Sequence, residues 1–445
     1  MDATKKRFAG RLSGARRGVL AIASGSLIGQ AILALGTPVL SRLYDPAAFG
    51  VFSAIVSIAS IVGPAATLKL EWAMLLADDE DDARRLMRLS LGSVVVVSVA
   101  SGLVAWLWTG LGQDAAYLTT AGGPLWVGAT VLTTGAFVLF SQAALRGRNY
   151  SVVASRSVYQ SAATIGGQLL LSLITRSPAG LLGGYVFGRG VGFWALFKAS
   201  KDLFAAPKGR GYARVLRTFW RFPLVFTPSG LLNTLGTQLP LLIVAAWFGA
   251  SSAGELGMAQ RLVFIPSTLV GASMGQVFGA ELSKRLRERT GGERGLYIRA
   301  SLHLGYVAVP VVAVLVFVAP WFLPLLLGPS WEFSGEFAQA MALSVGLGLI
   351  ASPVSIVYNL YQRSLPSLIL DISRVALIAV TTGLAIALHA DAIQTTWLLY
   401  GGQAINYLVT WVYGLRIVSG AEPEQTEKPE QTEKPEPPTA AEGPA

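Results

Sequence analysis

The sequence Phe222-Pro-Leu-Val-Phe-Thr-Pro-Ser-Gly-Leu-Leu-Asn233 opens the stretch that decides the fold. An apolar run continues to Phe248, small residues cover 249–254, and a second apolar run ends at Gly279. Each run has about 25 residues, which is enough to cross a hydrocarbon core roughly 30 Å thick, and the short turn between them can only reverse the chain. The stretch therefore predicts a hairpin of two membrane-spanning helices.

This hairpin carries residues that are rare inside a membrane. Arg261 lies about two turns into the second helix. Proline and glycine interrupt the first helix at Pro223, Pro228, Gly230, Gly236 and Pro240. Such residues are tolerated mainly where a helix faces protein or water rather than lipid. We therefore expect the hairpin to form one wall of a polar cavity.

The composition extends this prediction to the whole chain. The 445 residues are 53% hydrophobic and 13% charged, and the mean hydropathy is +0.54. These values indicate a polytopic membrane protein, and apolar runs without strand-like alternation favour an all-α fold. We expect about twelve transmembrane helices, near 19–40, 50–68, 90–109, 119–142, 153–175, 179–199, 222–248, 254–280, 300–319, 337–360, 365–388 and 393–416.

Lysine and arginine predict the orientation. All but five of the 35 Lys and Arg residues fall on one side if both termini are cytoplasmic, as the positive-inside rule requires. Their segments are 1–18, 69–88, 146–156, 198–221, 284–299, Arg363 and the end from Arg416. The exceptions are Arg42 and Arg176 outside, and Arg189, Arg261 and Arg374 within helices. The net charge of +10 therefore indicates topology and contact with anionic phospholipids, not binding of nucleic acid.

The chain divides into two equivalent halves. We expect a six-helix bundle over 1–200, a basic cytoplasmic linker over 201–221, a second bundle over 222–417 and a disordered cytoplasmic tail over 418–445. The stretch ending in Ala-Ala-Phe-Gly50 is echoed by the one ending in Ser-Ser-Ala-Gly254, each at a turn between two helices. Gly25, Gly29, Gly36 and Pro38 interrupt the predicted helix over 19–40, as glycine and proline interrupt the one over 222–248. Corresponding interrupted helices in two repeats indicate the central site of a transporter.

Several polar and proline positions resemble a known family. They include Arg221-Phe-Pro, Thr227-Pro-Ser-Gly-Leu-Leu-Asn233, Gln238-Leu-Pro240, Ala259-Gln-Arg261, Gln276-Val-Phe278, Ser41-Arg-Leu-Tyr-Asp-Pro46 and Leu145-Arg-Gly-Arg-Asn-Tyr150. Over roughly 20–415 the chain resembles the Wzx-type polysaccharide and O-antigen flippases of the multidrug/oligosaccharidyl-lipid/polysaccharide (MOP) exporter superfamily.

The resemblance implies two six-helix bundles around a central cavity, as in the related MATE exporters. It also implies a flippase in the bacterial inner membrane that moves an undecaprenyl-pyrophosphate-linked oligosaccharide from the cytoplasmic to the periplasmic leaflet. The pathway would make O-antigen (lipopolysaccharide), capsule or exopolysaccharide, with a polymerase and a chain-length protein as partners.

Such a substrate needs hydrogen-bonding groups for its sugars and fixed cations for its phosphates. The substrate-binding candidates are Arg189, Arg261, Gln30, Gln238, Asn233 and Gln276. Arg189 would meet phosphate or pair within the bundle, Arg261 matches the family pattern, and Asn233 would equally serve the disrupted backbone.

Three further charged residues are candidates for ion coupling. Asp371 and Arg374 are three residues apart on one helix face, which predicts an internal ion pair. Glu71, at the inner end of the second helix, is a further coupling candidate. His303 and His389 are isolated, so no metal site is expected.

Two other functions are alternatives to a flippase. A membrane-integral glycan polymerase or glycosyltransferase usually presents charged residues on a large outer loop, but the longest outer segment carries only Glu332 and Glu336 as acids. A MATE-like drug exporter should be rich in buried acids, whereas arginines at least equal carboxylates at depth. No phosphate-binding Gly-x-x-x-x-Gly-Lys-Ser/Thr motif occurs, so we do not expect direct use of ATP. We also expect no cofactor and no catalytic activity.

Overall fold

The computed structural model describes residues 2–110, 122–147, 149–207, 211–361 and 364–420. Within these ranges the chain forms helices and no β-strand, so the prediction of an all-α fold is confirmed. Most of the expected tail over 418–445 lies outside the described residues. The helices are α1 (Asp2–Leu43), α2 (Pro46–Ala66), α3 (Leu70–Leu76), α4 (Glu80–Gly110), α6 (Gly123–Arg146), α7 (Tyr150–Ser172), α8 (Pro178–Ala199), η1 (Lys201–Phe204), α9 (Tyr212–Thr218), η2 (Phe222–Phe226), α10 (Thr227–Glu288), α11 (Glu293–Ala313), η3 (Val314–Val318), α12 (Ala319–Leu327), η4 (Pro329–Trp331), α13 (Ser334–Val354), α14 (Val357–Leu360), α15 (Ser364–Ala387) and α16 (Ala392–Gly420).

Each of the twelve predicted spans overlaps one of these helices. By length and composition, 8 helices of the described part are apolar enough to cross a membrane. The other predicted spans fall on α7, α8, α16 and the second arm of α10, which carry more glycine and polar residues. The chain is therefore a multi-pass membrane protein.

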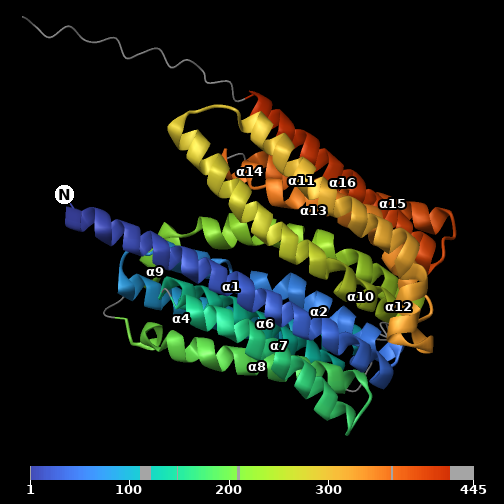
Figure 1. Cartoon of the computed structure of the whole chain (residues 1–445). Helices are drawn as coiled ribbons and strands as arrows, with labels where there is room; N and C mark the ends of the chain where they lie inside the picture. Colours follow the sequence, from blue (N-terminus) through green and yellow to red (C-terminus); the bar gives the residue numbers. More distant parts are fainter. Residues whose placement is uncertain (1, 111–121, 148, 208–210, 362–363, 421–445) are drawn as a thin grey trace, which may run out of the picture.

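The helices form two lobes (Figure 1). The first lobe contains α1 to α8, and the second contains α10 to α16. The predicted hairpin is α10, whose two arms meet at Gly249 with φ 82° and ψ 179°. A positive φ is accessible to glycine because it has no Cβ, so this residue allows the chain to reverse.

Glycine and proline interrupt the helices less than expected. The irregular part of the hairpin is η2, a π-helical turn, and α10 continues in helical conformation past Gly236 and Pro240 up to the kink. In α1 the glycines bring another helix close: a Cβ on Gly25 would lie 2.3 Å from the carbonyl oxygen of Ala154 on α7. Small residues serve such helix contacts in membranes.

Two glycines bring the lobes together in a reciprocal contact. A Cβ on Gly50 of α2 would lie 1.8 Å from the carbonyl oxygen of Ala250, and a Cβ on Gly254 would lie 1.8 Å from that of Pro46. Each glycine is the fifth residue of its helical arm and packs on the first residue of the other. The sequence echo of the two halves thus corresponds to a pair of equivalent contacts.

The α12–η4 segment completes this junction. Trp331 is fully buried; its Nε1 donates to the carbonyl of Ser41 at 2.9 Å, and its ring meets Phe49 edge-on at 5.8 Å. The Ser41 hydroxyl donates to the carbonyl of Leu327 at 2.8 Å. We call this junction of α2, the α10 kink and α12–η4 the closed end.

The hydrophobic core is shared only toward the closed end. The largest cluster of buried residues includes Leu40 and Phe49 from the first lobe and Met258 and Trp331 from the second. At the opposite end, one cluster belongs to the first lobe with α9, and another, around Tyr297, belongs to the second lobe alone. The lobes therefore pack together at one end and separately at the other.

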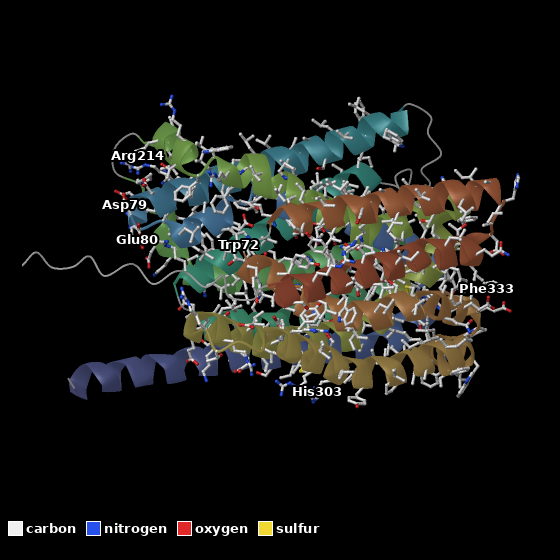
Figure 2. The ribbon with its side chains drawn as sticks, turned by 90° about the horizontal axis from the view of Figure 1, so that it is seen from above. Trp72, Asp79, Glu80, Arg214, His303 and Phe333 are labelled. Atoms are coloured by element: carbon white, nitrogen blue, oxygen red, sulfur yellow. The ribbon has the colours of Figure 1, made fainter. Side chains whose placement is uncertain are left out.

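Charged side chains mark that opposite end, which we call the α9 end. Figure 2 shows Asp79, Glu80 and Arg214 together there, whereas Phe333 lies at the closed end. Arg214 of α9 pairs with Asp82 at 2.9 Å, and Arg146 pairs with Glu80 at 3.0 Å. The Arg214–Asp82 pair attaches α9, in the segment that connects the lobes, to the first lobe, and the Arg146–Glu80 pair joins α6 to α4 within that lobe.

Candidate functional site

A polar cavity of about 460 Å³ lies between the first lobe and both arms of α10. Apolar side chains such as Leu33, Phe52 and Phe264 cover part of its wall. Its polar lining comes from α1, α2, α7, α8 and α10, namely Gln30, Ser53, Ser57, Gln160, Ser161, Thr164, Gln168, Tyr185, Arg189, Gln238, Gln260 and Arg261. No Asp or Glu is among the lining residues that the structure describes.

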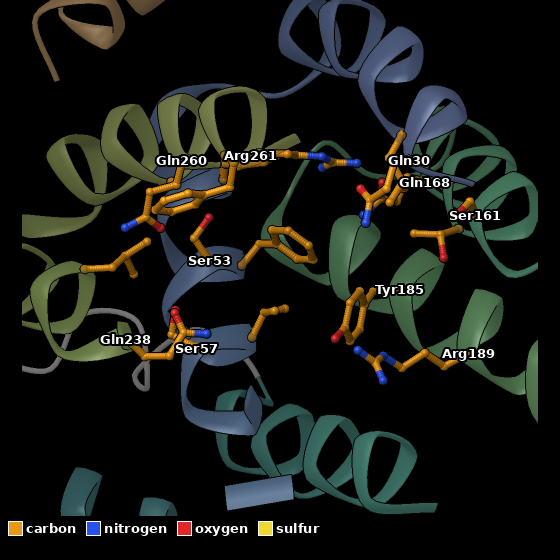
Figure 3. Close-up of a pocket in the computed structure, with 18 of the residues that line it drawn as sticks. Gln30, Ser53, Ser57, Ser161, Gln168, Tyr185, Arg189, Gln238, Gln260 and Arg261 are labelled. Carbon is orange, nitrogen blue, oxygen red and sulfur yellow. The ribbon is translucent and has the colours of Figure 1, made fainter. Parts of the chain in front are cut away.

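Four of the six predicted substrate-binding residues line this cavity: Gln30, Arg189, Gln238 and Arg261. In Figure 3, Arg261 reaches from α10 toward Gln30, while Arg189 projects from α8 beside Tyr185. The two guanidinium groups thus enter one cavity from different lobes. The structure brings together residues that are far apart in sequence.

Aromatic rings, not carboxylates, face these cations. The Cζ of Arg261 lies 5.8 Å from the ring centre of Phe49, and that of Arg189 lies 4.7 Å from Tyr185 and 4.9 Å from Phe137. Within the described part of the chain neither forms a salt bridge. Both guanidinium groups therefore keep charge available to an anion.

A third buried cation, Arg156, lies next to Arg189, although its position in the basic segment 146–156 predicts a place at the cytoplasmic surface. Arg156 lies on α7 and is only 9% exposed. Its Cζ lies 4.2 Å from the ring centre of Phe137, and its Nη1 donates to the hydroxyl of Ser141 at 2.5 Å. Arg156 and Arg189 thus share one aromatic ring and repel each other.

A stripe of glycines on α8 brings the two arginines together. Gly184, Gly188 and Gly192 follow one another at four-residue spacing. A Cβ on Gly188 would lie 2.0 Å from the hydroxyl oxygen of Thr164 on α7, and one on Gly192 would lie 3.5 Å from Cγ of Arg156. Such small-residue stripes allow close helix contact in membranes, and this spacing was the available sequence signal for the pairing.

Buried polar atoms that lack hydrogen-bond partners offer further contacts to a ligand. Oε1 of Gln160, Oε1 of Gln168 and Nε of Arg189 are buried and have no hydrogen-bond partner among the described residues. Leaving such an atom unpaired costs about 1–3 kcal/mol. A hydrated or sugar-bearing ligand would offer the missing partners.

Asn233, Asp371 and Arg374 belong to a different network, within the second lobe. Nδ2 of Asn233 donates to Oδ1 of Asp371 at 2.9 Å, and Nε of Arg374 donates to Oδ1 of Asn406 at 3.2 Å. Asp371 and Arg374 thus take different partners, and no salt bridge joins them among the described residues. This network lies outside the cavity lining.

The two remaining candidates also lie away from the cavity. Gln276 is exposed on the second arm of α10. Glu71 is fully buried on α3, and both of its carboxylate oxygens lack a hydrogen-bond partner among the described residues. Burial raises the pKa of Glu71 above its usual value, because removal from water disfavours the charged form.

Comparison with protein families agrees with the sequence resemblance. A family model described as polysaccharide biosynthesis protein matches residues 39–336. A comparison with curated protein sequences finds no match.

Solved structures of MOP superfamily transporters share the fold. The lipid II flippase MurJ in an inward closed conformation superposes with a TM-score of 0.66 at 13% identity, over 90% of this chain and 87% of that one. An inward-facing multidrug resistance MATE family transporter gives 0.61 at 15% identity, over 90% and 95%. A MOP superfamily transporter from Pyrococcus furiosus gives 0.55 at 14% identity, over 91% and 96%. The predicted two-lobed MOP fold is thereby confirmed.

Proposed function

This chain belongs to the polysaccharide biosynthesis protein family, and we propose that it flips an undecaprenyl-pyrophosphate-linked oligosaccharide between the leaflets of the bacterial inner membrane. The glycan would pass from the cytoplasmic to the periplasmic leaflet for assembly of O-antigen, capsule or exopolysaccharide. The work of such a protein is transport, without a chemical step.

The composition of the cavity is the main support for this proposal. It combines amides and hydroxyls, which can hydrogen-bond sugars, with Arg189 and Arg261, which can bind phosphate. A planar guanidinium matches phosphate oxygens in bidentate geometry. A site for a cationic drug would need carboxylates instead, and the described lining contains none.

The lobe arrangement supports alternating access. The lobes share a hydrophobic junction at the closed end and form separate cores at the α9 end. The positive-inside rule assigns the basic α9 end, with both termini, to the cytoplasm. A substrate would enter there and leave after the closed end opens, as the bundles over 1–200 and 222–417 rock about the linker over 201–221.

Several finer roles follow from the same proposal. Gln30 and Gln238 would contact the glycan directly, whereas Asn233 and Gln276 would act only in other states of the cycle. Asp371, Arg374 and Glu71 are the candidates for coupling to an ion gradient. Anionic phospholipids would contact the basic cytoplasmic segments, and a polymerase and a chain-length protein would receive the product.

Complementation of a host strain that lacks its flippase tests the proposal. Arg189→Ala and Arg261→Ala should each reduce surface glycan by about tenfold or more, since a charge-assisted hydrogen bond is worth about 1.5–3 kcal/mol. Lipid-linked glycan should accumulate in the inner leaflet. Arg176→Ala, at an exposed arginine between α7 and α8, is the matched control. Normal surface glycan in both cavity variants at equal expression would refute the proposed site.

A further inference from the structure

Arg156 presents an unbalanced charge in the first lobe. It is about nine-tenths buried, its Nε has no hydrogen-bond partner among the described residues, and no described carboxylate pairs with it. Its partners are the hydroxyl of Ser141 and the ring of Phe137. Neither neutralises a buried cation, and Arg189 at the same ring adds repulsion.

We infer that Arg156, Phe137 and Arg189 form a subsite for a diphosphate group, at the margin of the cavity between α6, α7 and α8. The inference rests on the proposed function and names the part of the substrate that this place receives. Two fixed guanidinium groups would bind the two phosphoryl groups, and Phe137 would hold both cations in position before the ligand arrives.

The position along the helices agrees with this role. Arg156 lies four residues before Gln160, so both side chains belong to one face of α7, and Gln160 lines the cavity. α7 begins at Tyr150 near the α9 end and runs past Gln160, Thr164 and Gln168. Arg156 therefore extends the polar wall toward the end at which the lobes form separate cores.

Two adjacent cations favour a diphosphate over a monophosphate. A monophosphate ester carries about −1.5 to −2 charge, but all of its acceptor oxygens lie on one phosphorus atom. A diphosphate presents charged oxygens on two phosphorus atoms, one for each guanidinium group. The same two cations would also attract the phosphate of a membrane lipid. The shared chemistry is therefore a phosphoryl anion, and the source must be separated by experiment.

Binding to the full-length protein in nanodiscs tests the inference. The probes are farnesyl diphosphate and farnesyl monophosphate, titrated in zwitterionic nanodiscs and in nanodiscs that contain phosphatidylglycerol. Wild type should bind the diphosphate at least tenfold more tightly than the monophosphate. Arg156→Met, which keeps the aliphatic stem, should lose tenfold or more in diphosphate affinity and most of the preference, while Arg156→Lys should keep part of both. Arg176→Met should behave as wild type.

Thermal unfolding without ligand separates binding from structure. Arg156→Met removes one of two repelling charges, so its Tm should equal or exceed that of wild type while the diphosphate no longer raises it. Diphosphate affinity within twofold of wild type in Arg156→Met would overturn the inference, as would equal binding of both probes. Displacement of the probe by phosphatidylglycerol would assign the subsite to lipid head groups and overturn it too. If diphosphate binding follows these expectations but no lipid-linked glycan is transported, the subsite stands and the proposed function fails.

Discussion

Replacing Gly50 or Gly254 with alanine tests whether close approach of α2 and α10 holds the closed end. In either variant the new Cβ would lie 1.8 Å from a carbonyl oxygen of the facing helix. Ordinary contact begins near 3.4 Å, so the backbones must separate by roughly 1.5 Å to restore normal packing. Overpacking of this kind costs about 1–3 kcal/mol.

This cost falls on the closed arrangement alone. Alanine favours a helix over glycine by about 1 kcal/mol, but both helices persist when the lobes separate, so this gain cancels. A net cost of about 2 kcal/mol lowers the ratio of closed to open molecules roughly 30-fold.

Closure can be measured by cysteine cross-linking, because the chain has no native cysteine that would react in the background. Cysteines replacing Arg42 and Leu325 would report closure when joined by a bifunctional thiol reagent. Nη2 of Arg42 lies 3.4 Å from the carbonyl oxygen of Leu325 across the lobes, and the reagent replaces the reach of the arginine side chain that a cysteine lacks. Cross-linking should slow sharply in Gly50→Ala and Gly254→Ala. Gly166→Ala is the control, because nothing lies within 4 Å of a Cβ there. Wild-type cross-linking rates in both glycine variants would show that this contact does not hold the lobes together.

Three further predictions concern other parts of the molecule. Trp331→Phe keeps an aromatic side chain, but its ring is smaller than indole and it loses the hydrogen bond to Ser41. Cross-linking at the closed end should therefore fall at least about fivefold, because the bond alone is worth about 1 kcal/mol and the lost buried volume adds to that cost; an unchanged rate would contradict the assigned role. Glu71→Gln should raise Tm at pH 7.5, because the raised pKa of Glu71 means that the folded state disfavours the charged carboxylate and that stability falls as pH rises above the ordinary carboxyl range. The difference should shrink on acidification toward the unfolded pKa, and a pH-independent difference would argue against burial of the charge as its cause. A chain that ends at Gly420 should retain wild-type transport, because the polar, proline-rich remainder cannot build a core, and loss of transport at equal expression would refute this.

The helices of this fold could be predicted from sequence because membrane spans are set by the length of apolar runs. The hairpin around Gly249 and the echo between the two halves were likewise local signals. The roles of glycine and proline depend on packing against other helices, so they could not be predicted from the sequence of one helix. Gly25 looks like a break in a helix when read along the chain, but it is a contact surface once α7 lies against it.

The cavity could be predicted only in part. Arg189 and Arg261 were identifiable because they stand alone in apolar runs. Arg156 follows a basic segment near the start of its helix, and only the packing of α7 on α8 reveals that it is buried beside Phe137.

The partners of Asp371 and Arg374 were hidden for a similar reason. Their spacing predicts an ion pair on one helix. Instead, Asp371 accepts a hydrogen bond from Asn233 of α10, and Arg374 donates one to Asn406 of α16. Partners from distant segments decide such pairings, and no pattern within a single helix reports them.

Transport by purified protein in liposomes is the sharpest test of whether this protein is a flippase. The measurement is the rate at which a prenyl-diphosphate-linked oligosaccharide, placed in one leaflet, becomes accessible to a glycan-modifying enzyme on the other side without ATP. We expect rapid transfer by wild type, transfer at least tenfold slower for Arg189→Ala and Arg261→Ala, and wild-type transfer for Arg176→Ala. Transfer that is no faster than in protein-free liposomes, or that is unchanged in both cavity variants, would contradict this expectation.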